Sequence, residues 1–158
     1  MRCLLALLPL ALLAFALPAA AQSIAPRTIE IQVGDNMHFT PARIDARPGE
    51  QLRVVLKDVG TMPKAAMGHD FVLLKKGADP KAFADKSATA RDTNYIAPAL
   101  QDQVLASTPL VGPGETAEVT FKAPDKNGEY TFLCSFPGHF AVGMKGTLVV
   151  APRDMGRD

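Results

Sequence analysis

The residues with the clearest chemistry lie in one short segment, from Cys134 to Met144. This segment holds a thiol at Cys134, an imidazole at His139 and a thioether at Met144, and Pro137-Gly138 turns the chain between the first two. Thiolate and thioether sulfur favour reduced copper, while imidazole also accepts the oxidised ion. Two histidines and one cysteine with a weak axial methionine form the donor set of electron-transfer copper sites. The segment therefore predicts a copper site that takes a second histidine from elsewhere.

The second histidine is His38 or His69, because the chain has three histidines in all. His69 follows Gly68, and a glycine leaves room for a backbone carbonyl to approach a metal ion. His38 lies between Met37 and Phe39 and is interpreted as an ordinary surface histidine. We therefore expect His69 to complete the donor set.

Cys134 has no partner for an internal disulfide. The other cysteine of the chain, Cys3, lies in an N-terminal segment that we expect to be removed. A lone cysteine in an exported protein is an intermolecular disulfide partner, a buried inert residue or a metal ligand. Metal ligation explains Cys134, His139 and Met144 together, whereas the other readings leave the histidine and the methionine unexplained.

Residues 1–21 have the pattern of a secretory signal peptide. They begin with a positive charge at Arg2, continue in a short apolar run interrupted by Pro9, and end in small residues at Ala21. The interrupted run is too short for a membrane anchor. We expect cleavage after Ala21 and an exported domain comprising residues 22–158.

The charge of the exported part gives no reason for binding nucleic acid or an anionic membrane. The whole chain carries 17 Lys and Arg against 16 Asp and Glu, and removal of Arg2 leaves 16 against 16. A neutral chain lacks the electrostatic attraction that drives such binding. No later segment is apolar for long enough to enter a bilayer, so we expect no membrane insertion.

The donors must be held by short strands, which the sequence predicts from alternating apolar and polar residues. The expected strands cover residues 28–33, 37–39, 43–45, 51–56, 69–74, 103–106, 116–121, 129–134 and 146–150. The insertion at 75–99 differs, because Asp79 and Pro80 are typical of a helix N-terminus. This pattern predicts a single all-β sandwich with one short helix in an insertion.

Two segments resemble the ligand segments of the azurin-like cupredoxins. Residues 67–73, Met-Gly-His-Asp-Phe-Val-Leu, resemble the segment of the first histidine, and residues 134–139 with 144–148 resemble the ligand loop. The similarity extends to residues 34–39 and 108–115, and so spans most of the mature domain. The resemblance implies an eight-stranded Greek-key β-sandwich that carries single electrons in the bacterial periplasm and is not an enzyme.

The resemblance also implies roles for individual residues around one type 1 copper ion per chain. His69, Cys134 and His139 would form the trigonal copper plane. Met144 would be the long axial ligand, and the carbonyl of Gly68 would make a weak contact on the opposite side.

The chain departs from the azurin pattern at several positions. Asp70 stands where the family has an Asn that ties the two ligand segments together, and a carboxylate accepts hydrogen bonds but donates none. Such neighbouring groups tune a metal, so the reduction potential is expected to differ. Four residues, 140–143, separate the second histidine from the methionine instead of three, as in auracyanin- and rusticyanin-like cupredoxins. Arg27 and Gly49 stand in place of the usual disulfide, and Phe71 lies near the position of the absent core tryptophan.

The resemblance further implies that the outer edge of His139 is exposed within an apolar patch where redox proteins dock. Contiguous exposed apolar surface marks docking sites, and methionine suits short-lived partners. We call this surface the His139 patch. It comprises Met37, Met62, Pro63, Ala66, Met67, Phe136, Pro137, Gly138, Phe140, Ala141 and Val142. We expect a monomer that meets its redox partners here.

Other functions can be weighed against the same residues. A periplasmic copper chaperone or buffer would use the same ligands and pass on Cu(I), but a closed site with two histidines favours retention of the ion. A copper enzyme needs a further histidine-rich centre, and only His38 is spare. Zinc prefers four N, S or O donors in a tetrahedron, and the ligand loop holds no second cysteine and no carboxylate.

Overall fold

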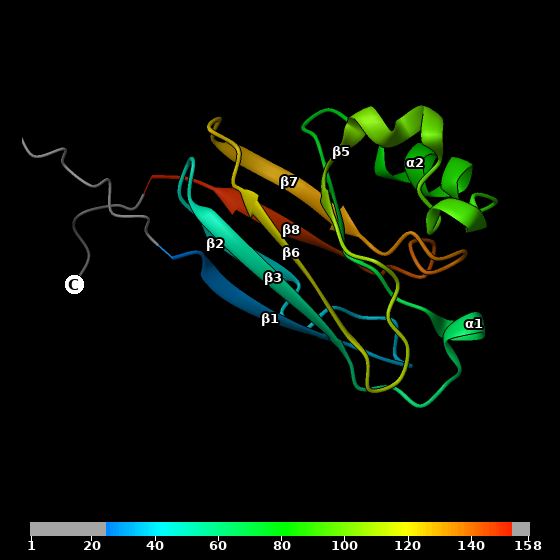
Figure 1. Cartoon of the computed structure of the whole chain (residues 1–158). Coiled ribbons are helices and arrows are strands. Elements are labelled where there is room, and N and C mark those ends of the chain that lie inside the picture. The colour runs from blue at the N-terminus through cyan, green and yellow to red at the C-terminus, as the bar shows by residue number, and fades with distance from the viewer. Residues whose placement is uncertain (1–24, 153–158) are drawn as a thin grey trace, which may run out of the picture.

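Residues 25–152, the part that the computed structural model describes, form a sandwich of two β-sheets (Figure 1). Its eight strands are β1 Arg27–Val33, β2 Arg43–Ala46, β3 Gln51–Asp58, β4 Val72–Leu74, β5 Val104–Ser107, β6 Thr116–Lys122, β7 Gly128–Leu133 and β8 Lys145–Val150. One sheet has the order β1-β3-β6 and the other β2-β8-β7-β4-β5. The expected eight-stranded all-β sandwich is confirmed. The expected signal peptide and its cleavage site after Ala21 lie outside the described residues.

The strand register brings three chain segments to one end of the five-stranded sheet. Val72 at the start of β4 pairs with Leu133 at the end of β7, and Leu133 pairs with Lys145 at the start of β8. The residues just before β4, just after β7 and just before β8 therefore meet. These positions hold His69, Cys134 and Met144.

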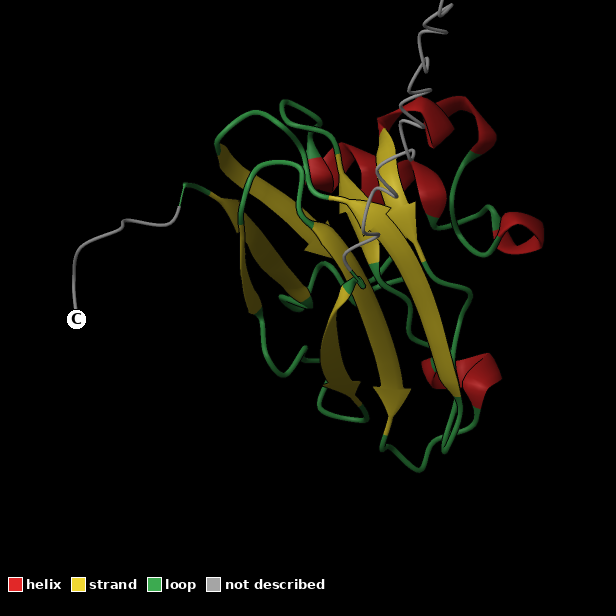
Figure 2. Cartoon of the chain, turned by 60° about the vertical axis from the view of Figure 1, so that its left-hand side comes forward, coloured by secondary structure: helices red, strands yellow, loops and turns green. Residues whose placement is uncertain are grey.

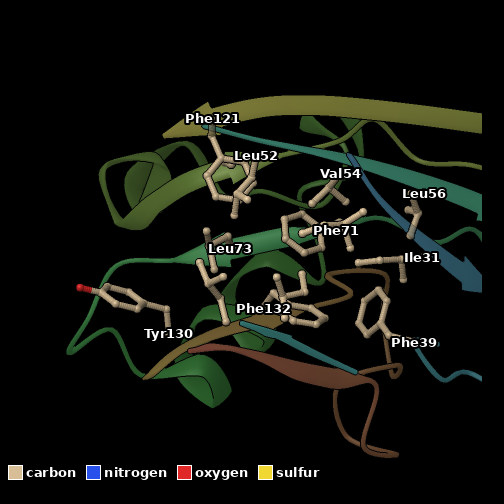
Figure 3. Close-up of a cluster of buried hydrophobic side chains, with 14 of the residues drawn as sticks. Ile31, Phe39, Leu52, Val54, Leu56, Phe71, Leu73, Phe121, Tyr130 and Phe132 are labelled. Atoms are coloured by element: carbon tan, nitrogen blue, oxygen red, sulfur yellow. The ribbon is translucent and has the colours of Figure 1, made fainter. Parts of the chain in front are cut away.

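The core lies between the sheets and extends to this end. Figure 3 shows Val54 and Leu56 of the three-stranded sheet facing Phe71 and Phe132 of the other layer. The Phe71 and Phe132 rings lie 5.0 Å apart, and they fill the centre of a chain without tryptophan. Burial of each such side chain contributes roughly 1.5–3 kcal/mol to folding. The same cluster includes Cys134, so the core itself fixes the site.

The helical segments gather at one side of the sandwich (Figure 2). Helix α2, Pro80–Ser87, begins as the sequence predicts, because the Asp79 side chain accepts hydrogen bonds from the amides of Lys81 and Ala82. The insertion buries a second apolar cluster against the five-stranded sheet, consisting of Val72, Leu74, Phe83, Ile96, Leu100 and Leu133. The sequence did not predict the one-turn helix α1 or the two 3-10 helices. These are α1 Lys64–Met67, η1 Arg91–Thr93 and η2 Pro98–Gln103.

The expected strand at 37–39 does not form, and the expected strand at 69–74 is shorter than the alternation suggests. Met37 has a positive φ of 53°, and of residues 37–40 only Thr40 forms a bridge, with Gln32. The expected strand at 69–74 begins at Val72, and His69 makes an isolated bridge to Val111 instead. No helix in the described part of the chain is long and apolar enough to span a membrane.

Candidate metal centre

Three side chains from two distant parts of the sequence, His69 in one and Cys134 and His139 in the other, converge at the end of the sandwich. The donor atoms of His69, Cys134 and His139 all lie within 4.8 Å of one another, and all three residues are buried. The Sγ atom of Cys134 lies 3.4 Å from Nδ1 of His139, and the two imidazole centroids are 4.9 Å apart. Within residues 25–152 this is the one group of at least three His, Cys, Asp or Glu side chains placed to hold a metal ion.

Backbone hydrogen bonds hold these residues in place. The amide of His69 donates to the Val111 carbonyl at 3.0 Å, and the Val111 amide donates back at 2.7 Å. The ligand loop closes on itself, because the Cys134 amide donates to the Met144 carbonyl and the Met144 amide donates to the His139 carbonyl. The donor cluster is therefore held by the backbone on both sides.

His69 provides the test of whether a metal fits. Both ring nitrogens of His69 are buried, and within residues 25–152 neither makes a hydrogen bond of ordinary geometry. A buried polar atom without a partner costs about 1–3 kcal/mol, and such atoms often mark the place of an unseen ligand. A metal ion between His69, Cys134 and His139 would supply a partner to one of these nitrogens, and copper suits this combination of imidazole and thiolate.

Burial also sets the protonation of the donors. It lowers the pKa of His139 to about 4, with a smaller effect from His69, and it lowers the pKa of His69 as well. Both imidazoles are therefore neutral at pH 7, which is the form that binds metals. Burial raises the pKa of the Cys134 thiol well above its usual value, and the Asp70 carboxylate adds to the rise. Metal binding must displace this thiol proton.

Cys134 is a free cysteine with no exposed surface. A thiol at this depth cannot reach a second chain, so the reading as an intermolecular disulfide partner is excluded for the folded protein. The reading as an inert core residue leaves the two neighbouring imidazoles unexplained. The metal-ligand reading accounts for all three side chains.

Gly68 and Met144 both lie near Cys134. The Gly68 carbonyl oxygen is 4.0 Å from the Sγ atom of Cys134. A Cβ atom on Gly68 would lie 2.9 Å from the Lys64 carbonyl oxygen and 3.3 Å from the Phe136 ring, so a larger residue would force this packing to shift. Met144 is fully buried in the same core cluster as Cys134.

Asp70 joins the first-histidine segment to the ligand loop. Its Oδ1 atom accepts a hydrogen bond from the Ser135 amide at 2.7 Å, and its Oδ2 atom accepts one from the Ser135 hydroxyl at 2.5 Å. Burial raises the pKa of this carboxyl to about 6. The sequence analysis anticipated the linking role of position 70 but missed its partner, Ser135. The only sequence signal for Ser135 is a hydroxyl directly after the cysteine.

Two further residues complete the surroundings. The Thr108 hydroxyl accepts a hydrogen bond of 3.1 Å from the Phe71 amide, a contact that the sequence analysis did not single out. His38 is exposed and lies outside the donor cluster, as expected, with its Nδ1 atom 2.5 Å from the Asn36 carbonyl oxygen.

The residues of the expected His139 patch differ widely in exposure. Val142 is 58% exposed and Met62 41%, whereas Phe136 and Phe140 are half-buried. His139 itself is only 4% exposed, so its ring edge contributes little to the surface. The expectation of an exposed imidazole edge is thus met only to this small extent.

The comparisons with known proteins point to a copper-binding family. The family model for copper-binding proteins of the plastocyanin/azurin family matches residues 26–151. Azurin of Alcaligenes faecalis is 40% identical over 123 residues, which cover 76% of this chain and 94% of that protein. Azurin iso-2 of Methylomonas sp. strain J is 40% identical over 119 residues, which cover 73% of this chain and 90% of that one.

Solved structures extend the similarity to three dimensions. Auracyanin A of Chloroflexus aurantiacus, described as a "blue" copper protein, has a TM-score of 0.71 at 31% identity and covers 80% of this chain and 100% of its own. Dithionite-reduced auracyanin of Roseiflexus castenholzii has a TM-score of 0.70 at 34% identity, and the match covers 81% of this chain and 99% of that one. The chain belongs to the plastocyanin/azurin family of copper-binding proteins.

Proposed function

We propose that the mature chain is a periplasmic type 1 blue-copper protein that carries single electrons between redox proteins. The observation that supports this most directly is the buried cluster of His69, Cys134 and His139, in which the His69 ring makes no hydrogen bond of ordinary geometry to the described residues. Copper bound there would take up and release one electron. Membership of the family supports an electron carrier rather than an enzyme.

The proposed ligands are His69, Cys134 and His139, with Met144 and the Gly68 carbonyl as weaker ones. The supporting facts are the full burial of Met144 and the position of the Gly68 oxygen 4.0 Å from the cysteine sulfur. The surrounding core excludes water from the donors and holds them by backbone hydrogen bonds. A site held in this way changes little between oxidation states, which favours fast electron transfer.

The proposed partners are redox proteins that dock on the His139 patch, and the proposed oligomeric state is a monomer. The exposure of Val142 and Met62 supports an apolar surface at this end. The Phe136 ring lies 4.7 Å from the His139 ring, so a partner that touches the patch comes close to a donor residue.

The proposed location follows from residues 1–21. We infer that they direct export and are removed after Ala21, which leaves a single cupredoxin domain at 22–158. Mass spectrometry of the protein from a periplasmic fraction should give a chain that begins at Gln22. A chain that retains Met1 would contradict this inference.

The visible absorption spectrum of the mature chain with one equivalent of Cu(II) tests the proposed function. We expect an intense blue band that disappears in the Cys134→Ser variant and bleaches reversibly with reductant. A colourless protein that binds Cu(I) tightly would instead indicate a copper chaperone or buffer.

A further inference from the structure

A groove with an aromatic floor and a cationic rim lies beside the metal centre. It has a volume of about 350 Å³. Its lining residues are Lys64, Ala65, Arg91, Tyr95, Leu110 and Phe136. Four of the six are apolar or aromatic, and the two others carry positive charge. Arg91 and Tyr95 belong to the 75–99 insertion.

The floor of the groove is in contact with a donor residue. The Phe136 ring lies 4.7 Å from the His139 ring, and the Tyr95 ring meets Phe136 edge-on at 5.2 Å. Anything that enters the groove and touches Phe136 is therefore one side chain away from His139. His139 itself is only 4% exposed, so contact through Phe136 is the more accessible route to this donor.

The backbone around Tyr95 adopts an uncommon conformation to make this contact. Asn94 and Tyr95 are consecutive left-handed residues with φ of 52° and 54°. Such a conformation costs a non-glycine residue roughly 1–3 kcal/mol and persists where the surroundings enforce it, often at functional sites. The Tyr95 amide donates to the Ala90 carbonyl at 2.9 Å, and the Thr93 hydroxyl donates to the Ile96 carbonyl at 2.7 Å. The turn is thus fixed in the form that places Tyr95 on Phe136.

The rim carries an available positive charge at Arg91. Arg91 is exposed and forms no ion pair with any residue of the described chain, whereas Lys64 is paired with Glu115 at 2.7 Å. Guanidinium groups bind carboxylates through two parallel hydrogen bonds. Because residues 22–158 carry 16 positive and 16 negative side chains, local charges decide which partners are attracted.

We propose that the groove receives the carboxylate-bearing surface of an acidic redox protein, with Arg91 as the anchoring cation and Phe136 as the contact next to His139. The proposal rests on the proposed electron-carrier function and specifies the chemistry of its partner. It locates the charged part of the docking face on the side formed by α1 and the 91–95 segment.

The test is nuclear magnetic resonance of the copper-loaded, reduced mature chain labelled with 15N. The probes are hexacyanochromate(III), an inert paramagnetic anion, and a hexaglutamate peptide. We expect hexacyanochromate to broaden the amide signals of Ala65, Arg91 and Tyr95, and the peptide to shift the same signals. The cationic complex hexaamminechromium(III) should leave them sharp.

Two charge reversals provide the comparison. Arg91→Glu should weaken the binding of both anionic probes roughly ten-fold, because the proposed anchoring cation is replaced by an anion. Lys126→Glu makes the same change in net charge in the turn between β6 and β7, at the opposite end of the sheet, and should have little effect. The proposal would be overturned if the two variants weakened probe binding equally, or if the peptide left the amide signals of the groove residues unshifted.

The outcome is separable from that of the proposed function. The Arg91→Glu variant should keep the blue band and its reversible bleaching, because Arg91 is not a donor. If the band is present and the groove does not respond, only the groove proposal fails. A missing band in the unaltered chain would count against the copper function itself.

Discussion

The amide of Ser135 donates a hydrogen bond of 2.7 Å to the carboxylate of Asp70, across 65 residues of sequence. This bond ties the residue after His69 to the residue after Cys134, so the two donor segments cannot shift independently. The link is made by a fully buried acid, and this makes the protein sensitive to pH near the metal centre.

Asp70 and His139 have opposite effects on the stability of the metal-free protein. Burial raises the pKa of Asp70 from 3.8 to about 6, because the protonated carboxyl is favoured in the folded protein. The stabilisation that this protonation gives is complete below pH 3.8 and is lost as the pH rises to about 6. Burial, with a smaller effect of the His69 charge, lowers the pKa of His139 from 6.5 to about 4, because the neutral imidazole is favoured in the folded protein. The stabilisation that the neutral ring gives is complete above pH 6.5 and is lost as the pH falls to about 4. The two effects oppose each other in this window.

The variant Asp70→Asn should therefore expose the histidine effect. We expect the free energy of unfolding of the metal-free variant to fall by about 3 kcal/mol on acidification through this window, and that of the unaltered protein to fall by much less. Urea unfolding of both proteins at several pH values measures the difference. Parallel pH profiles would show that Asp70 is not a buried ionisable group.

Replacement of Met144 by leucine tests the proposed weak ligand. Met144 is fully buried, and swaps that conserve volume usually cost less than about 1.5 kcal/mol, so the variant should fold. It should still bind copper through the other donors but with a higher reduction potential, because loss of a donor disfavours the more highly charged Cu(II). Voltammetry of the two proteins gives the answer, and an unchanged potential would remove Met144 from the ligand set.

A lysine at Val142 tests the His139 patch. Val142 is 58% exposed, so Val142→Lys should leave the blue band unchanged while electron self-exchange slows roughly ten-fold through charge repulsion between two copies. The matched control is Leu105→Lys on β5, where an exposed apolar residue outside the patch receives the same charge. Self-exchange rates come from line broadening in mixed Cu(I)/Cu(II) samples. Equal self-exchange rates in the two variants would show that the docking surface is not the His139 patch.

An alanine at Gly68 tests the tight packing beside the donors. Its Cβ atom would lie 2.9 Å from the Lys64 carbonyl oxygen, so the chain must shift near His69. We expect a loss of about 1–3 kcal/mol in unfolding free energy and a changed blue band. Chemical unfolding and the absorption spectrum record the two effects. A variant with native stability and spectrum would mean that this loop adapts freely.

The donor set could be predicted because its residue types are scarce. Cys134 is the only cysteine after residue 21, and three histidines leave only two choices for the partner of His139. Helix α2 could also be predicted, because Asp79 and Pro80 favour a helix start through local contacts, and the expected cap forms.

The missed features depend on contacts between distant segments. Helix α1 has a single turn, no acidic residue in that turn and no side-chain cap, so the sequence gives no signal for it. His69 pairs with Val111 rather than continuing the strand, and the alternation of residues 69–74 does not reveal this. The contact of Tyr95 with Phe136 likewise depends on a left-handed turn that no residue pattern announces.

Coulometric titration of the copper-loaded mature chain in the presence of a Cu(I) chelator tests the central claim most directly. The buried cluster of His69, Cys134 and His139 should retain the ion in both oxidation states, so we predict the uptake and release of one electron per chain over repeated cycles without transfer of copper to the chelator. Loss of copper to the chelator on the first reduction would contradict the account and identify a protein that delivers copper instead of carrying electrons.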